Sequence, residues 1–237
     1  MWSYLEIERY EPTHPIADQV AIVSHGFPGN YTKNEDLAFA LSALAQIDTY
    51  VIKYKGVGSR IGEFSFKGVM KDISEFMSQF EKTTRFTMVA HSWGGTASLQ
   101  GVLDHSQQIQ QIFYLAPMLE WPKQSYIISI IKDLARWQGQ LKGFFPNVES
   151  LIAESEQLYE SQPDRLQKLA KLNVPITVFH GTRDTVLEIS LSEKFVQSCR
   201  SAELITSEEG HYLEDRPRLR TLILKEVLDL RYKDQPK

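Results

Sequence analysis

The sequence of 237 residues predicts an α/β fold, in which helices cover both faces of a mainly parallel, doubly wound sheet and a small helical cap is inserted. Short apolar runs alternate with amphipathic segments of helical period, which is the pattern of parallel strands joined by crossover helices. The segment 117–172 departs from this alternation, because it has helical periodicity but no strand-like run. We therefore expect one domain over 1–237 with an inserted helical cap over 117–172.

Six short apolar runs are the expected strands of the sheet. In chain order they are 20–23, 50–52, 86–90, 112–115, 176–179 and the weaker run 202–206. Runs of this length that are rich in β-branched and aromatic residues are typical of strands buried on both faces. Turn-forming glycine or proline follows several of them, which places loops at their carboxyl ends.

Apolar residues at helical spacing predict the helices between these strands. Leu37, Leu41 and Leu44 lie on one face of a helix over 34–44. Similar stripes predict helices over 69–80, 96–103 and, near the end of the chain, 219–230.

The inserted segment is also expected to be helical, since a loop of that length without secondary structure would be unusual in a compact domain. Its apolar residues recur at helical spacing and form two groups along the segment. The first group is Ile127, Ile130, Ile131 and Leu134, and the second lies around Leu151, Leu158 and Leu166.

The composition favours a globular cytoplasmic protein that binds no nucleic acid and does not span a membrane. Hydrophobic residues make up 42%, and 26 Lys and Arg stand against 30 Asp and Glu, which argues against a large phosphate-binding surface. No apolar stretch approaches the roughly 20 residues of a membrane span, and the N-terminus lacks the pattern of a secretory signal. The single cysteine, Cys199, allows neither an internal disulfide nor a thiolate metal cluster, and we expect it inside a helix.

The segment Ala90-His91-Ser92-Trp93-Gly94-Gly95 comes directly after an expected strand and directly before an expected helix. A nucleophilic serine on such a turn needs a strained backbone, with small residues two positions to either side. Ala90 and Gly94 meet that requirement. The turn also places Ser92 at a helix N-terminus, where free N–H groups favour developing negative charge.

A serine needs a base, and the base needs an acid that holds it, before it becomes a good nucleophile at neutral pH. Asp184 follows the expected strand 176–179, and His211 follows the expected strand 202–206. The chain order Ser, Asp, His is one known order of a catalytic triad. Glu188 and Asp215 are rival acids, but their positions fit less well.

The other histidines are weaker candidates for the base. His25 and His180 begin glycine-containing loops, where an imidazole more often bonds to nearby backbone. His91 flanks the serine and is expected to point elsewhere on the turn. His14 and His105 are expected at the surface.

The loop His25-Gly26-Phe27-Pro28-Gly29 follows the first expected strand and is a candidate oxyanion hole. Acyl transfer generates an oxyanion, and fixed backbone donors aimed at it are usually the largest catalytic contribution. The glycines let the backbone turn, which leaves the N–H of Phe27 as one donor. Trp93, the residue after the serine, supplies the second.

These motifs together resemble those of the α/β-hydrolase-fold serine hydrolases, over almost the whole chain from about Val20 to the final helix. The resemblance implies Ser92 as nucleophile, Asp184 as acid and His211 as base. It also implies Phe27 and Trp93 as oxyanion donors, and 117–172 as the variable cap. One departure is Ala90, which stands where glycine is commoner.

The implied function is hydrolysis of a carboxylic ester or thioester of a small or hydrophobic acyl group, with no metal or organic cofactor. Two alternatives stay open. The elbow His91-Ser92-Trp93-Gly94-Gly95 is similar to that of proline iminopeptidases, which read a substrate ammonium with acidic side chains near the cap. The other alternative is a hydrolase-fold binding module without catalysis. The acids available for the first alternative are Glu120, Glu149, Glu154 and Glu156.

The apolar side chains of the cap would suit a hydrophobic substrate, but they would equally serve to pack the cap on the core. A partner or membrane-surface role for the isoleucine-rich stripe is also open. The partner we expect is a small acyl compound, and the sequence leaves the oligomeric state undetermined. The expected substrate-binding residues are Trp121, Tyr126, Ile130 and Trp137.

Overall fold

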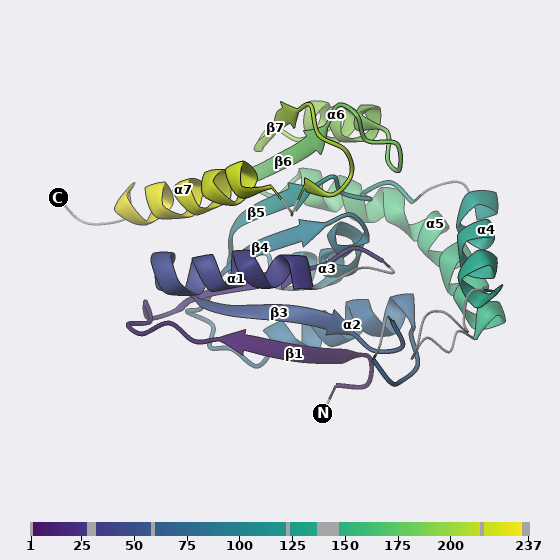
Figure 1. Ribbon diagram of the computed structural model, residues 1–237, viewed down its shortest axis with the longest axis horizontal. Helices are drawn as coiled ribbons and strands as arrows, with labels where there is room; N and C mark the ends of the chain where they lie inside the picture. The colour runs from purple at the N-terminus through teal and green to yellow at the C-terminus, as the bar shows by residue number, and fades with distance from the viewer. Residues whose placement is uncertain are drawn as a thin grey trace.

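The computed structural model describes residues 2–27, 32–57, 60–121, 124–136, 147–213 and 216–233. Within them the strands form one seven-stranded sheet with the order β1-β3-β2-β4-β5-β6-β7 (Figure 1). All neighbouring strands are parallel except β1, which pairs with β3 in antiparallel orientation. The strands are β1 (Leu5–Tyr10), β2 (Gln19–Ser24), β3 (Asp48–Tyr54), β4 (Arg85–His91), β5 (Ile109–Leu115), β6 (Ile176–Gly181) and β7 (Ala202–Ser207).

The helices alternate with the strands along most of the chain. They are α1 (Thr32–Ala45), α2 (Phe66–Met77), α3 (Trp93–Asp104), α4 (Gln124–Arg136), α5 (Val148–Ala170), α6 (Ile189–Ser198) and α7 (Pro217–Lys233). The predicted fold class, a mainly parallel sheet with helices on both faces, is therefore confirmed. All six expected strands are present, and each of the four expected helices has a counterpart.

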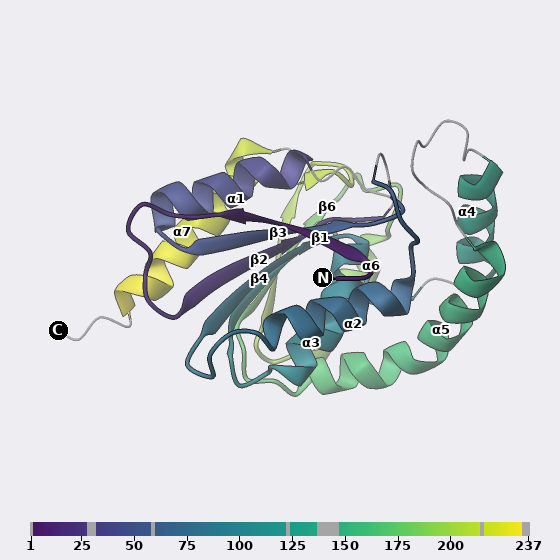
Figure 2. The ribbon, with the colours of Figure 1, turned by 90° about the horizontal axis from the view of Figure 1, so that it is seen from below.

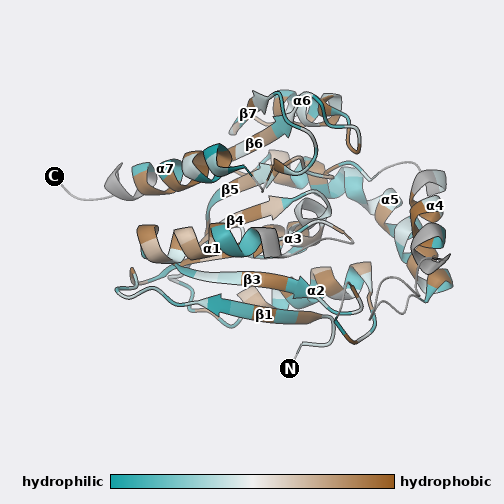
Figure 3. Ribbon diagram, in the orientation of Figure 1, coloured by the Kyte–Doolittle hydropathy of each residue, from teal (hydrophilic) through white to brown (hydrophobic). Residues whose placement is uncertain are grey.

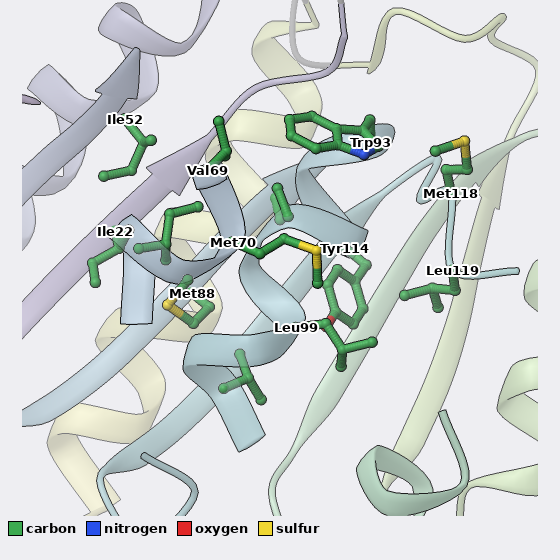
Figure 4. Close-up of a cluster of buried hydrophobic side chains, with 14 of the residues drawn as sticks. Ile22, Ile52, Val69, Met70, Met88, Trp93, Leu99, Tyr114, Met118 and Leu119 are labelled. Atoms are coloured by element: carbon green, nitrogen blue, oxygen red, sulfur yellow. The ribbon is translucent and has the colours of Figure 1, made fainter. Parts of the chain in front are cut away.

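The sheet separates two hydrophobic cores. The larger core lies between the sheet and α2, α3, α5 and α6, and the smaller one lies between the sheet and α1 and α7 (Figure 2). Strand β2 shows how the alternation of side chains feeds both cores, because Val20 and Ile22 point to the larger one and Ala21 and Val23 to the smaller one. Figure 4 shows part of the larger core, with Met70 of α2 and Tyr114 of β5 packed near Leu99 of α3.

The edge strand β1 was not among the expected strands. Its sequence alternates apolar and charged residues, and only Leu5 is fully buried. Figure 3 shows a largely hydrophilic β1 at the edge of the sheet, whereas β4 at the centre is more hydrophobic. An edge strand buries one face at most, so its sequence alternates between buried and exposed positions and contains no continuous apolar run that would predict a strand.

Helices α4 and α5 occupy the interval between β5 and β6, where the sequence predicts a helical cap. Helix α5 packs against α3 and α2, and α4 packs against α5 at the far end (Figure 1). Pro163 lies inside α5 and removes one backbone donor, a common cause of a bend, and α5 curves around the sheet in Figure 2. In the part of the chain described, no helix is both long and apolar enough to cross a membrane.

Tyr54 links the end of β3 to the loop that follows β2. Its hydroxyl donates a 2.7 Å hydrogen bond to the carbonyl oxygen of His25 and lies 2.7 Å from Ser24 Oγ, which therefore donates to it. All three residues are buried. This arrangement fixes the backbone immediately before Gly26 and Phe27.

Replacing Tyr54 with Phe should therefore destabilise the fold. The change leaves the Ser24 hydroxyl and the His25 carbonyl buried without this partner, at a cost of roughly 1–3 kcal/mol for each such group. We expect the free energy of unfolding, measured by urea denaturation, to fall by about 2 kcal/mol or more. Tyr50→Phe is a suitable control, because the Tyr50 hydroxyl bonds only the partly exposed Asp48. An equal loss in both variants would contradict the role given to Tyr54.

Candidate active site

Four loops at the carboxyl edge of the parallel sheet bring the predicted site residues together. Ser92 follows β4, Asp184 lies three residues after β6, His211 follows β7, and Phe27 lies in the loop after β2. Strands β2, β4, β5, β6 and β7 are consecutive in the sheet and parallel, so their carboxyl ends share one edge. That edge is where open α/β sheets bind their ligands.

Ser92 lies on a strained turn between β4 and α3. Its backbone has φ 52° and ψ −123°, a conformation that residues other than glycine rarely adopt. The turn fits only because its neighbours are small. A Cβ on Gly94 would lie 2.6 Å from the carbonyl oxygen of Ser24, and one on Gly26 would lie 2.9 Å from Ser92 Cβ. The backbone N–H of Ser92 donates to the Leu115 carbonyl, which ties the turn to β5.

Ser92, His211 and Asp184 form one continuous hydrogen-bonded chain. Ser92 Oγ lies 3.0 Å from His211 Nε2, and His211 Nδ1 lies 2.8 Å from Asp184 Oδ2. The carboxylate accepts, so His211 Nδ1 carries the proton and Nε2 is left to accept from the serine hydroxyl. Ser92 and His211 are each 8% exposed, and the Asp184 side chain is fully buried.

Four donors hold the carboxylate of Asp184. Its Oδ1 accepts from the backbone N–H groups of Val186 and Leu187, at 2.8 and 2.9 Å. Its Oδ2 accepts from His211 and lies 3.3 Å from His180 Nε2. Burial alone would raise the pKa of Asp184, but the hydrogen bonds from His180, His211 and the two backbone groups outweigh it and hold that pKa well below its usual range.

His180 contacts Asp184, and the sequence does not predict this contact. It was expected to bond nearby backbone, and its Nε2 does lie 3.0 Å from the Leu187 carbonyl, but the same atom also faces Asp184. Its Nδ1 lies 2.7 Å from Ser192 Oγ, which fixes the ring from the other side. The only signal in the sequence is the spacing of four residues between His180 and Asp184, which is too common to identify such a pair.

Backbone hydrogen bonds join the loops that carry the acid and the histidine. The N–H groups of Thr182 and Arg183 donate to the carbonyls of Ser207 and Glu209. A Cβ on Gly181 would lie 2.2 Å from that Glu209 oxygen, so the close approach depends on glycine. His91 Nε2 lies 2.9 Å from the His211 carbonyl, and His91 thus supports the backbone of His211.

Phe27 and Trp93, the two expected oxyanion donors, line the same cavity as Ser92. Trp93 begins α3, so its backbone N–H belongs to the first turn, which has no partner within the helix. The Phe27 ring packs edge-on against the Trp93 ring at 5.9 Å between centroids and stacks on Phe64 at 4.6 Å. These contacts hold the Phe27 loop against the serine turn. Pro28 and Gly29 of the expected loop lie outside the described residues.

A cavity of about 70 Å³ opens at Ser92. Among the described residues its lining carries no acidic or basic side chain. The lining comes from the serine turn, the loop after β2, the start of α2, the chain after β5, helix α4 and the loop after β6. These residues are Phe27, Phe66, Ser92, Trp93, Met118, Trp121, Ile127, Ile130, Ile131, Val186 and Leu187.

Two of the four expected substrate-binding residues, Trp121 and Ile130, are part of this lining. Tyr126 falls in α4, but its side chain lies outside what the structure describes, as does the whole of Trp137. The sequence does not single out the lining residues Phe66, Met118 and Val186–Leu187, because nothing in their local sequence distinguishes a cavity wall from ordinary core.

Cys199 lies one residue beyond the end of α6, so the expectation that it lies inside that helix is wrong. Its backbone is extended there, because the chain is already turning into β7. The side chain is buried and remote from Ser92 in sequence and in the sheet. In the described ranges, no group of three or more His, Cys, Asp or Glu side chains has the arrangement of a metal site.

Two models of known protein families match this chain. The family model described as "Serine aminopeptidase, S33" matches residues 15–150, more than half of the chain. The chain belongs to this family. A second model, described as "Serine hydrolase (FSH1)", matches residues 125–220, which include Asp184 and His211. The resemblance to serine hydrolases of the α/β-hydrolase fold is therefore confirmed.

Similar proteins are known among lipases and esterases. A monoglyceride lipase of Saccharomyces cerevisiae is 32% identical over 63 residues, which span 27% of this chain and only 20% of the yeast protein. A carboxylesterase structure from the thaumarchaeon Nitrososphaera gargenis has a TM-score of 0.76 at 15% identity, and the match covers 98% of this chain and 96% of that one. A monoacylglycerol lipase of Paleococcus ferrophilus has a TM-score of 0.69 at 16% identity, with coverage of 94% and 99%.

The backbone conformation of Ser92 predicts an unusual order of stability among its variants. Glycine adopts this φ without strain, whereas alanine keeps the strain of a side chain, which costs of order 1–3 kcal/mol. We expect Ser92→Gly to have a free energy of unfolding about 1 kcal/mol higher than Ser92→Ala in urea denaturation. In most positions glycine is the less stable of the two. Equal stabilities, or the ordinary order, would show that the turn is not strained.

His25, between β2 and Gly26, predicts a specific loss of stability in acid. Burial lowers its pKa to about 3, whereas an unfolded chain has a histidine pKa near 6.5. Between these values the unfolded state binds a proton that the folded state does not, so stability falls as the pH falls. The contribution reaches up to ~1.4 kcal/mol per pH unit.

His25→Asn should remove this contribution. We expect the unfolding free energy of the wild type to fall more steeply between pH 6 and pH 4 than that of the variant, by about 1 kcal/mol per pH unit. Any packing loss in the variant is the same at every pH and is measured at pH 7. Parallel curves for the two proteins would contradict a buried, neutral His25.

Proposed function

We propose that this protein is a serine esterase that cleaves a carboxylic ester or thioester of a small or hydrophobic acyl group. The observation that carries the proposal is the hydrogen-bonded chain Ser92–His211–Asp184 at the wall of an apolar cavity. Family membership supports hydrolysis, and the similar proteins named as esterases or lipases support an ester as substrate. Those names belong to the other proteins and serve here only as support.

In the proposed mechanism, His211 Nε2 takes the proton of Ser92 Oγ as the oxygen attacks the acyl carbon. The carbonyl oxygen becomes negative and accepts hydrogen bonds from the backbone N–H groups of Phe27 and Trp93. His211 then gives its proton to the leaving alcohol or thiol, and an acyl-enzyme remains on Ser92. Water attacks that acyl group with His211 again acting as base, and the carboxylic acid is released.

Asp184 keeps His211 in the required tautomer and stabilises the imidazolium that forms during each step. Its low pKa keeps it ionised across the neutral range, so it remains an acceptor throughout the reaction. The hydrogen bonds from Val186, Leu187 and His180 hold the carboxylate in place. We therefore assign His180 as a positioning residue that acts through Asp184.

The cavity lining supports an apolar acyl group. Ile127, Ile130 and Ile131 of α4 face Ser92 across the cavity, so α4 would act as part of the predicted cap over 117–172. These three side chains belong to the stripe Ile127, Ile130, Ile131 and Leu134, for which a partner surface or a membrane surface is an alternative. Their place in the cavity wall favours the substrate role.

The alternative activity, an aminopeptidase, is favoured by the description of the family model. An ammonium group would need an acidic side chain near Ser92, and the described lining has none. Glu120 pairs with Lys194 at 2.7 Å, and Glu154 accepts from Ser65 Oγ at 2.7 Å. Glu149 and Glu156 are exposed on α5. We therefore place the esterase first.

A fluorophosphonate probe tests the nucleophile directly. The wild type should be labelled, and Ser92→Ala and His211→Ala should lose the labelling, because the serine needs its own oxygen and its base. We expect Ser92→Ala and Asp184→Asn to lower kcat for a nitrophenyl ester by roughly 10³-fold or more. Circular dichroism would show that the variants are folded. Labelling that survives Ser92→Ala would refute the assignment, and a wild type that is never labelled would favour a binding module.

A second measurement separates the two enzyme classes. Nitrophenyl esters and thioesters of increasing acyl length are compared with aminoacyl anilides at equal concentration. Turnover of esters that is lost in Ser92→Ala supports the proposal. Turnover of the anilides alone would replace it with the aminopeptidase.

A further inference from the structure

A second, larger hollow lies on the outer side of the cavity wall. It is a groove of about 900 Å³ between α5 and α6, which we call the α5–α6 groove. Helix α5 contributes Tyr159, Pro163 and Leu166 to its lining, and α6 contributes Leu191 and Phe195. Charged side chains such as Lys171 and Glu160 also belong to the lining, so the groove combines apolar and polar surface.

Trp121 belongs to the lining of both the Ser92 cavity and the α5–α6 groove. It is 5% exposed, and its indole N–H donates a 3.0 Å hydrogen bond to Ser155 Oγ of α5, which is fully buried. On the cavity side, its ring packs edge-on against Phe66 at 5.4 Å. The preceding residue, Glu120, is tied to α6 by the ion pair with Lys194. The indole is therefore held as a fixed wall between the two hollows.

The volumes of the groove and of the Ser92 cavity differ by more than tenfold. The indole that separates them should therefore limit the length of the substrate. The Ser92 cavity has about 70 Å³, against about 900 Å³ for the groove. A short acyl group therefore fits beside Ser92, whereas a longer unbranched chain meets the indole. Beyond the indole, the groove offers apolar surface of the kind that a hydrocarbon chain buries.

We propose that Trp121 sets the acyl length that the enzyme accepts, because its indole closes the Ser92 cavity off from the α5–α6 groove, which would otherwise hold the distal part of an unbranched acyl chain. This inference rests on the proposed function. Shortening the side chain at position 121 joins the groove to the Ser92 cavity. Removing the acceptor of the indole N–H at Ser155 loosens the wall without removing it.

The test compares kcat/KM for octanoyl and butyryl nitrophenyl esters, written as a ratio that cancels differences in active enzyme. We expect Trp121→Leu to raise this ratio by at least about tenfold, because each methylene that leaves water contributes roughly fourfold. Ser155→Ala should raise it less. An unchanged ratio in a folded Trp121→Leu variant that still cleaves the butyryl ester overturns the proposal.

Two double variants identify where the longer chain lies. Leu166→Trp fills the groove, so in the Trp121→Leu protein it should return the ratio to within about twofold of the wild type. Ile130→Ala enlarges the cavity on the α4 side, away from the groove. A ratio raised by Ile130→Ala should therefore persist when Leu166→Trp is added. If Leu166→Trp lowers the ratio equally in the Trp121→Leu and Ile130→Ala proteins, or in neither of them, the acyl chain does not enter the groove. Either result would overturn the proposal.

Two further outcomes are distinguishable. Should Trp121→Leu not fold, as judged by circular dichroism, the ratios of Ser155→Ala and Trp121→Phe decide the question, and unchanged ratios in both overturn the proposal. A wild type that cleaves neither ester but is labelled by the fluorophosphonate contradicts the proposed ester substrate rather than the role of Trp121. In that case the rates of labelling by butyl and octyl fluorophosphonates replace the ester ratio, with the same expected changes.

Discussion

The geometry of the site depends on one strained turn. Ser92 has a positive φ at the junction of β4 and α3, and this conformation points the serine away from the strand and towards the cavity. The strain is tolerated because the backbone of β2 approaches closely enough to support the turn, and that approach needs the missing side chain of Gly94. The geometry of the site therefore depends on the strand order, which places β2 and β5 on either side of β4.

Asp184 and His211 are brought together by a second approach between chain segments. Loops after β6 and β7 are joined by backbone hydrogen bonds, and Gly181 permits the contact. Because β6 and β7 are neighbours in the sheet, two loops that are separated by α6 in sequence meet beside Ser92. The strand order therefore explains how His211 contacts the hydroxyl of Ser92, which lies 119 positions earlier in the sequence.

Much of this architecture could be predicted from the sequence, because buried parallel strands give continuous apolar runs and turn residues mark their carboxyl ends. The same reasoning predicts Ser92, Asp184 and His211 as site residues, each from its place after a strand, and the structure brings the three together. The edge strand β1 was missed because half of its residues face solvent or charged neighbours. Contacts that join distant segments, such as His180 with Asp184 or Phe66 with the cavity, leave no local pattern.

In the loop after β6, Val186 and Leu187 make two kinds of contact. The backbone N–H groups of Val186 and Leu187 hold the carboxylate of Asp184, while their side chains form part of the cavity wall. A substitution there that reshapes the cavity wall also moves the two N–H groups that bond Asp184. In the proposed esterase, a change of substrate at this loop would therefore also change kcat. Among the described lining residues, those of α4 and Trp121 make no hydrogen bond to Asp184. Divergence of substrate range within this architecture is therefore easier from the side of α4 and Trp121 than from the side of β6.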